Sequence, residues 1–166
     1  MAISLNRFCG TLRGFTLIEL VIVIAIIAIL ALMALPSLFG QTTRKQILES
    51  MPLAEIAKNG VAEYYRQNSE MPADNATAKI PDAKKIVGNY VSAVTVNNGA
   101  VNITFGNNVN TALKDRQLTI RPAYVKDTPI VPISWICAGR TVPKDMTVAG
   151  TNVTDIPLES IPLKCP

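Results

Sequence analysis

The chain has 166 residues, a formal net charge of +4 and no histidine. Without histidine, Ser-His-Asp and Cys-His catalysis and most zinc sites are excluded; no nucleophile motif or phosphate loop replaces them, so we expect no catalytic site, metal or cofactor. From residue 15 onward, 14 basic side chains stand against 12 acidic ones, a balance too mild to argue for nucleic-acid binding by itself.

The first element is a short basic segment followed by a long apolar run. Residues 1–14 carry two arginines and no acid, and residues 15–35 contain only two polar side chains, Thr16 and Glu19. As a helix, the run would span about 31 Å, the thickness of a bilayer core. Basic residues beside such a segment stay cytoplasmic, so the rest of the chain is expected on the far side. An acid inside a membrane helix costs about 2.5–3.5 kcal/mol at mid-bilayer and usually marks function.

The sequence Gly-Phe-Thr-Leu-Ile-Glu at residues 14–19, continued by the apolar run, resembles the N-terminus of type IV pilins. The resemblance is close as far as Pro36 and weaker beyond it. It implies a leader over residues 1–14, which a prepilin peptidase would cut from the chain between Gly14 and Phe15. The same membrane enzyme would then methylate the new amino group of Phe15.

The resemblance also implies an assembly route and a division of the chain. Residues 15–36 would form a helix that lies first in the bacterial inner membrane and then in the filament core, and residues 37–166 would form the exported head. Machinery driven by a cytoplasmic ATPase would join the subunits into an extracellular homopolymer. In it, the Glu19 carboxylate would face the Phe15 amino group of a neighbouring subunit, so that neither charge is left alone in low dielectric.

The helical pattern continues beyond the membrane segment to about Gln67. Side chains such as Leu48, Ala54, Ala57, Val61 and Tyr65 recur at spacings of three and four among charged residues, which predicts an amphipathic helix with one face on a sheet. We therefore expect one long, interrupted helix from Phe15 to about Gln67.

Two prolines and two glycines weaken this helix. Pro36 and Pro52 each remove a backbone donor and should kink it, and Gly40 and Gly60 lower helicity by about 1 kcal/mol each. Similar pilins are thought to lose helical structure near Pro36 on polymerisation, so the segment from Pro36 to Gly40 is a candidate soft joint. A plain kink without a mechanical role is the alternative.

The second half of the chain predicts an antiparallel sheet. Residues 68–85 are polar with two prolines and read as an exposed loop. Strands are expected over 90–96 and 100–105, joined by an Asn-Gly turn, then over 117–121, ending at Pro122, and over 133–137, with Trp135 available for the core. Helix followed by meander gives the α+β class: a long helix packed on about four strands.

Cys9, Cys137 and Cys165 are the only cysteines. If residues 1–14 are removed, Cys9 leaves with them and the other two can pair in an oxidising compartment. The bridge would bound a C-terminal loop of 29 residues and, by the chain-entropy model, stabilise it by about 3.6 kcal/mol. We expect little else to hold this tail, whose placement resembles the disulfide region of pilins.

Two alternatives to a major pilin remain open on sequence grounds. A minor pilin or a type II secretion pseudopilin would share the N-terminus, although the two C-terminal cysteines favour a pilin. A DNA-binding competence pilin would use scattered basic residues, with acids among them: Lys84, Lys85, Lys114, Arg116, Arg121, Lys126, Arg140 and Lys144. Ser69 and the three N-x-T sequons at Asn75, Asn102 and Asn152 are weak candidates for glycosylation.

Overall fold

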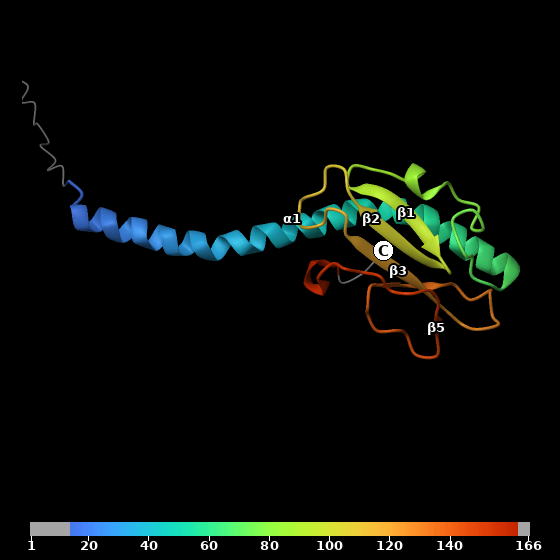
Figure 1. The fold of residues 1–166 in the computed structure, drawn as a ribbon. Coiled ribbons are helices and arrows are strands. Elements are labelled where there is room, and N and C mark those ends of the chain that lie inside the picture. The colour runs from blue at the N-terminus through green and yellow to red at the C-terminus, as the bar shows by residue number, and fades with distance from the viewer. Residues whose placement is uncertain (1–13, 163–166) are drawn as a thin grey trace, which may run out of the picture. The chain divides into compact units, whose positions relative to one another are not determined.

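In the computed structural model, the backbone is described for residues 14–162 and the side chains for 14–32 and 41–162. Two compact units divide between Leu38 and Phe39. One helix, α1 (Leu17–Asn68), contributes residues to both units (Figure 1). The predicted helix is therefore confirmed, with its start shifted by two residues and its end by one.

The predicted interruptions of α1 are absent, because the helix is a single element through Pro36 and Pro52. At Pro52 the surroundings explain this continuity. Pro52 is exposed, whereas Met51 and Ala54 beside it are buried in the core. The hydrogen bond that proline removes therefore falls on the solvent side, where water can satisfy the freed carbonyl, while the buried face holds the helix in place.

The head contains an antiparallel sheet in the order β1-β2-β3-β4. Its main strands are β1 (Val91–Asn97), β2 (Ala100–Phe105), β3 (Gln117–Tyr124) and β4 (Ser134–Cys137). All four predicted strands are confirmed. A fifth, β5 (Thr147–Val148), pairs with the end of β3; short 3₁₀ turns, η1 (Ala83–Lys85) and η2 (Leu158–Ser160), complete the described elements.

The predicted end of the third strand at Pro122 is wrong, since β3 continues to Tyr124. The last β3 residue paired with β2 is Ile120, so the missing N–H of Pro122 takes no bond from that ladder. The Pro122 carbonyl accepts a hydrogen bond from the Ala149 N–H at 3.1 Å, and β5 then pairs with the end of β3. Proline is tolerated here because its missing donor is not required.

The β1–β2 hairpin has the predicted Asn-Gly turn. Asn97 pairs with Ala100, and the two residues between them, Asn98 and Gly99, have φ of 46° and 82°. Positive φ at both central positions is what a type I′ turn requires and what the twist of the two strands favours.

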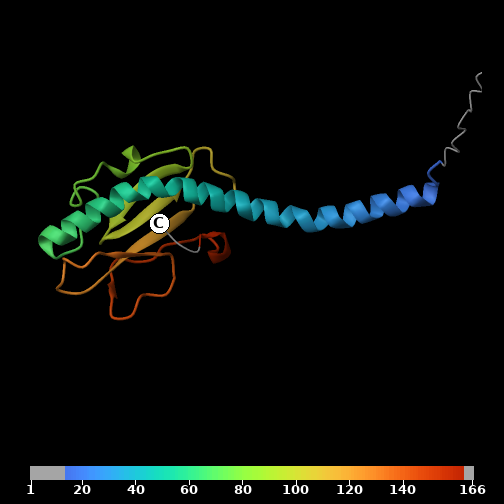
Figure 2. The same cartoon turned by 180° about the vertical axis from the view of Figure 1, so that it is seen from behind.

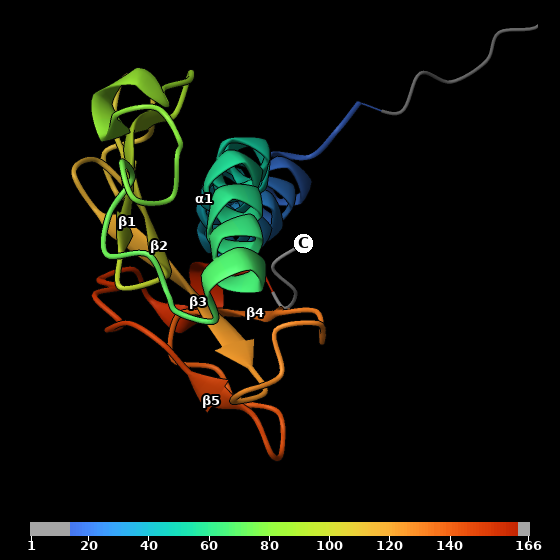
Figure 3. The same ribbon diagram turned by 90° about the vertical axis from the view of Figure 1, so that its right-hand side faces the viewer.

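The core of the head lies between α1 and one face of the sheet, as the two opposite views show (Figures 1 and 2). Figure 3 shows the same layer arrangement from the end of the helix. The buried helix positions include Ile47, Met51, Ala54, Ala57, Val61 and Tyr65, and the buried strand positions include Val91, Val94, Val96, Val101, Ile103, Phe105, Leu118 and Ile120. Leu48, which the periodicity placed with the buried set, is instead 44% exposed.

A lysine lies on the buried helix face, which the sequence did not predict. Lys58 is 5% exposed and forms an ion pair with Glu55, one turn away. Its ammonium group also lies 5.6 Å from the ring centroid of Trp135 on β4, within reach of a cation–π interaction. Trp135 is partly buried against the core, so this residue joins β4 to the helix rather than filling the centre.

The segment predicted to be an exposed loop, residues 68–85, is in part a packed element. Asn75 and Ala78 are buried, and a Cβ on Gly60 of α1 would lie 2.4 Å from Ile80 Cγ2 and 2.9 Å from the Ala78 carbonyl oxygen. Gly60 is therefore explained by close approach of this segment to the helix. The exposed-loop prediction is thus confirmed for most of these residues and wrong for Pro72, Asn75 and Ala78, whose burial composition did not predict.

Candidate functional site

Gly14 and Phe15 precede the first turn of α1, and both are exposed. Phe15 is 84% exposed. The peptide bond between them is the predicted cleavage point, and it lies outside regular structure. A protease that binds its substrate in extended form therefore needs no local unfolding at this position.

Glu19 caps its own helix. Its Oε2 accepts hydrogen bonds from the Thr16 N–H at 3.0 Å and the Thr16 hydroxyl at 2.8 Å, and the Glu19 N–H donates to Thr16 Oγ1 at 3.3 Å. This is a capping box, in which both residues satisfy N–H groups that a helix start leaves free. This role was not predicted from the sequence, although the Thr-x-x-Glu spacing before an apolar run is its signature. Glu19 thus has a partner within its own chain.

The first turns of α1 expose apolar side chains on all sides. From Leu17 to Leu32, ten Leu, Ile and Val residues besides Leu17 and Leu32 themselves are 46–67% exposed. Apolar exposure of this extent marks a surface that meets other apolar groups. Within the part of the chain that the structure describes, no helix has the length and apolarity needed to cross a membrane.

Pro36 and Gly40, the candidate joint, belong to α1 by their backbone. Their side chains fall outside the described residues, so the joint stays a prediction. Cys137 ends β4, is 2% exposed and is disulfide-bonded. Cys165, its expected partner, and Cys9 lie outside the described residues.

The expectation that little besides a disulfide holds the C-terminal tail is wrong. Three guanidinium groups donate to its backbone carbonyls: Arg116 to Asp155 at 2.8 Å, Arg44 to Glu159 at 2.6 Å, and Arg140 to Pro162 at 2.8 Å. Ile156 and Ile161 are 5% and 1% exposed. Hydrogen bonds and buried side chains therefore hold the tail on the head. The sequence did not predict these contacts, because the two partners of each are far apart along the chain.

These contacts also bear on the basic residues considered for DNA binding. Arg116, Arg121 and Arg140 are occupied with main-chain carbonyls of the region after β4, Arg121 with that of Ala138 at 3.2 Å. The lysines are exposed but lie at four separate places along the chain: Lys84 and Lys85 in η1, and Lys114, Lys126 and Lys144 each on a different connection between elements. Three of the eight candidate residues therefore bind backbone carbonyls of the protein itself, and the other five lie at four separate places.

Comparison with known proteins places the chain in a family. Residues 43–166 match the family described as pilin, a bacterial filament protein, and residues 13–35 match the prokaryotic N-terminal methylation motif. The chain belongs to the pilin family. The methylation motif covers Gly14, Phe15 and the Thr16–Glu19 capping box. The family is one of structural filament subunits rather than of catalysts.

Several relatives of this pilin match over most of its length. The type IV major pilin protein PilE of Neisseria gonorrhoeae is 38% identical, over 92% of this chain and 93% of the relative. A fimbrial protein of Neisseria meningitidis serogroup B is 38% identical over 84% of this chain and 80% of its own. The fimbrial protein EcpC of Eikenella corrodens is 48% identical over 54% of this chain and 58% of its own.

The sequons of this pilin differ in accessibility. The Asn75 side chain is 8% exposed and hydrogen-bonds to three backbone groups, and Asn102 is 9% exposed in β2, where its Oδ1 accepts from the Thr119 hydroxyl at 2.8 Å. A sugar on the Asn75 nitrogen would displace the two bonds that this nitrogen donates, and a sugar on Asn102 would have to enter a buried site. Asn152 is exposed, and so is Ser69, which follows α1 with φ of 57°.

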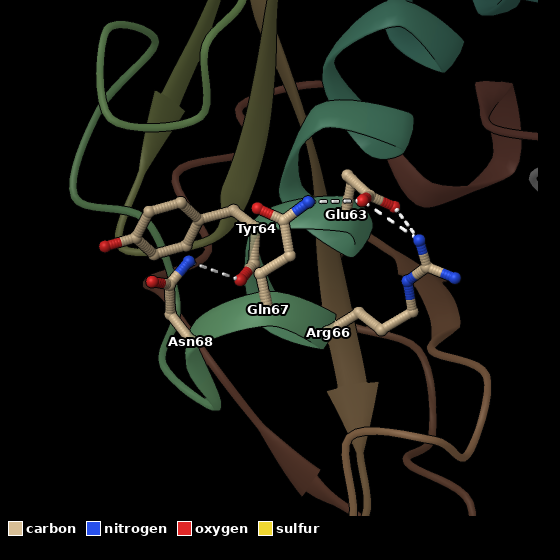
Figure 4. Close-up of polar contacts among 5 residues, drawn as sticks. All are labelled: Glu63, Tyr64, Arg66, Gln67 and Asn68. Carbon is tan, nitrogen blue, oxygen red and sulfur yellow. Dashed lines mark hydrogen bonds and ion pairs between the residues drawn. The ribbon is translucent and has the colours of Figure 1, made fainter.

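The end of α1 in the pilin head carries a polar cluster (Figure 4). Glu63 accepts hydrogen bonds from Arg66 and Gln67, and Asn68 Nδ2 donates to the Tyr64 carbonyl at 2.9 Å. The hydrogen bond from Arg66, followed by that from Gln67, lowers the pKa of Glu63. The Asn68 side chain thus adds a second donor to a carbonyl of the last helical turns. Each of these contacts stays within about one turn of α1, so the cluster stabilises the end of the helix and assembles no reactive group.

Proposed function

We propose that this pilin is the structural subunit of a type IV pilus, made as a precursor anchored in the bacterial inner membrane. The supporting observation is similarity to PilE over 92% of the chain, combined with an N-terminal helix whose apolar side chains are exposed on all sides. Residues 15–36 serve as the anchor, with the N-terminus cytoplasmic, and later as the filament core. The head, residues 37–166, is exported and becomes extracellular on assembly.

Maturation removes residues 1–14 and methylates Phe15. A prepilin peptidase cuts after Gly14, at the exposed and irregular peptide before α1, and transfers a methyl group to the new amine. Cys9 leaves with the leader, so Cys165 is the remaining partner for the disulfide of Cys137. The machinery that extracts the subunit is powered by a cytoplasmic ATPase, and Pro36 to Gly40 acts as the joint between anchor and head.

Glu19 sets the register of the filament by pairing with the Phe15 amine of a neighbouring subunit. The capping box gives Glu19 a first partner at Thr16, which reduces the cost of its charge before assembly. Losing a cap costs about 0.5–2 kcal/mol, whereas removing one partner of a buried ion pair costs about 3–5 kcal/mol because the other charge is left alone. The intersubunit pair is therefore the stronger requirement.

Two substitutions separate these roles. Glu19→Gln keeps a capping box, since glutamine also serves at that position, but removes the charge; we expect filaments on the cell surface to be lost. Thr16→Ala weakens the cap and leaves the carboxylate, so filaments should still form, in somewhat lower number. Electron microscopy and the mass of sheared filaments measure both. Normal filaments from Glu19→Gln would contradict the proposed pairing.

Surface abundance distinguishes a major pilin from a minor pilin or a pseudopilin. If this chain is the bulk of sheared filaments, it is the major subunit; intact mass and N-terminal sequencing of that material also report the cut, the methyl group and any glycan. Such filaments would serve adhesion, twitching motility or DNA uptake. For uptake, a filter-binding assay over a salt series tests direct DNA contact, because phosphate contacts give a steep slope.

A further inference from the structure

The edge strand of the sheet is covered by the chain's own connection between α1 and β1. β1 is the first strand in the sheet order and has only β2 as a strand partner. An edge strand presents unpaired N–H and C=O groups to which another chain can add. On β1, the Val94 carbonyl and the Val96 N–H are bonded to Asn75 and so point away from β2.

The Asn75 amide takes the place of a peptide group on this edge. Its Oδ1 accepts from the Val96 N–H at 2.6 Å, and its Nδ2 donates to the Val94 carbonyl at 3.0 Å and to the Pro81 carbonyl at 2.9 Å. Both amide hydrogens and the oxygen are used, in a side chain that is 8% exposed. A side-chain amide has the same donor and acceptor as the main chain, which explains why asparagine fits here.

Neighbouring residues extend the cover beyond β1 itself. The Asn98 N–H donates to the Ala73 carbonyl at 3.1 Å, and the Gly99 N–H donates to the Pro72 carbonyl at 2.9 Å. Residues 72–75, here named the edge cover, thus run beside the end of β1 and the hairpin turn. Within the edge cover, Pro72 and Ala73 bond through their backbone carbonyls, and Asn75 bonds through its side chain.

We propose that the edge cover, fastened by Asn75, blocks the addition of a second copy of this chain to β1 by strand pairing. The sequence of β1, Val-Ser-Ala-Val-Thr-Val-Asn, has high β propensity and neither charge nor proline. It therefore lacks the features that usually protect an edge. A copy of β1 is the natural partner, because filament subunits are packed at very high local concentration. With β1 blocked in this way, copies of the chain associate through the apolar N-terminal helix.

The test uses the full-length protein in detergent micelles. Asn75→Ala removes all three bonds of the amide, and exchange of the Val96 amide hydrogen should become about 5- to 150-fold faster, the range expected when a buried partner is lost. Concentration-dependent association with an intermolecular β band in the infrared should appear. Asn108→Ala is the matched control, since this asparagine is exposed and its side-chain amide bonds to Asn89; it should change neither reading.

A double variant identifies the mode of association. Thr95 is an exposed side chain of β1, and Thr95→Lys adds the charge that protects natural edges. In the Asn75→Ala background it should abolish association. If Asn75→Ala loses protection throughout the sheet, Asn75→Ser replaces it, because its uncharged hydroxyl is too short to bond to all three partners and leaves a smaller space than alanine. Unchanged Val96 exchange, no association, or association that Thr95→Lys leaves intact would each overturn the proposal.

Discussion

Replacing Gly150 by alanine should release the C-terminal region from the β1–β2 hairpin. Gly150 has φ of 73°, and a Cβ there would lie 2.4 Å from Ala100 Cβ, 3.0 Å from Ala100 N and 3.1 Å from the Asn97 carbonyl oxygen. The left-handed backbone costs an L-residue about 1–2 kcal/mol, and overpacking costs about 1–3 kcal/mol. Alanine regains about 0.4–1 kcal/mol by restricting the unfolded chain. The head should therefore lose about 1–5 kcal/mol, a large part of ordinary domain stability.

Gly139→Ala is the matched control, because it lies in the same C-terminal region. Its Cβ would have Asn152 Nδ2 at 3.7 Å as its nearest neighbour, an ordinary contact, and its φ is not positive. Guanidinium unfolding of the full chain in micelles, with the disulfide intact, can be followed by Trp135, the only tryptophan. If the two variants unfold within about 0.5 kcal/mol of each other, the assigned close packing of Gly150 is refuted.

Three further changes test other contacts of the head. Tyr65 donates to the Val125 carbonyl at 3.1 Å, so Tyr65→Phe should cost about 1 kcal/mol in denaturant unfolding. Burial raises the pKa of Tyr65; its contribution is complete below the unfolded pKa, near pH 10, and fades as pH rises through the folded value, so the variant should have a flatter alkaline limb. Hydrogen bonds from Thr77 lower the pKa of Asp74; its contribution is present above about pH 4 and fades as pH falls through the lowered value, so Asp74→Asn should flatten the acid limb. Reducing the disulfide alone should leave the tail protected from hydrogen exchange, whereas reduction of Arg140→Ala should expose it.

Local patterns in the sequence were enough to predict the helix and the four main strands of this pilin, but not β5 or the two 3₁₀ turns. The heptad-like spacing through Ala54, Val61 and Tyr65 predicted the helix face, and Asn98-Gly99 predicted the hairpin turn. Both depend on residues within a few positions of one another, so periodicity and turn chemistry determine them. The motif at Gly14, Phe15 and Glu19 is likewise local, which is why the sequence alone indicated the family.

The positions that the sequence left unexplained or misread depend on contacts across the fold. Asn75 was a candidate for glycosylation, but its side-chain amide hydrogen-bonds to the free edge of β1. Gly60 was predicted to weaken the helix, but its missing side chain allows the segment around Ala78 and Ile80 to pack against α1. Arg140 was a candidate for DNA binding, but its guanidinium group donates to the Pro162 carbonyl of the C-terminal tail. In each case the partner lies about 20 residues away, across a turn or a layer. No short-range pattern encodes such pairs, because only the packed tertiary structure brings them within hydrogen-bond or van der Waals distance.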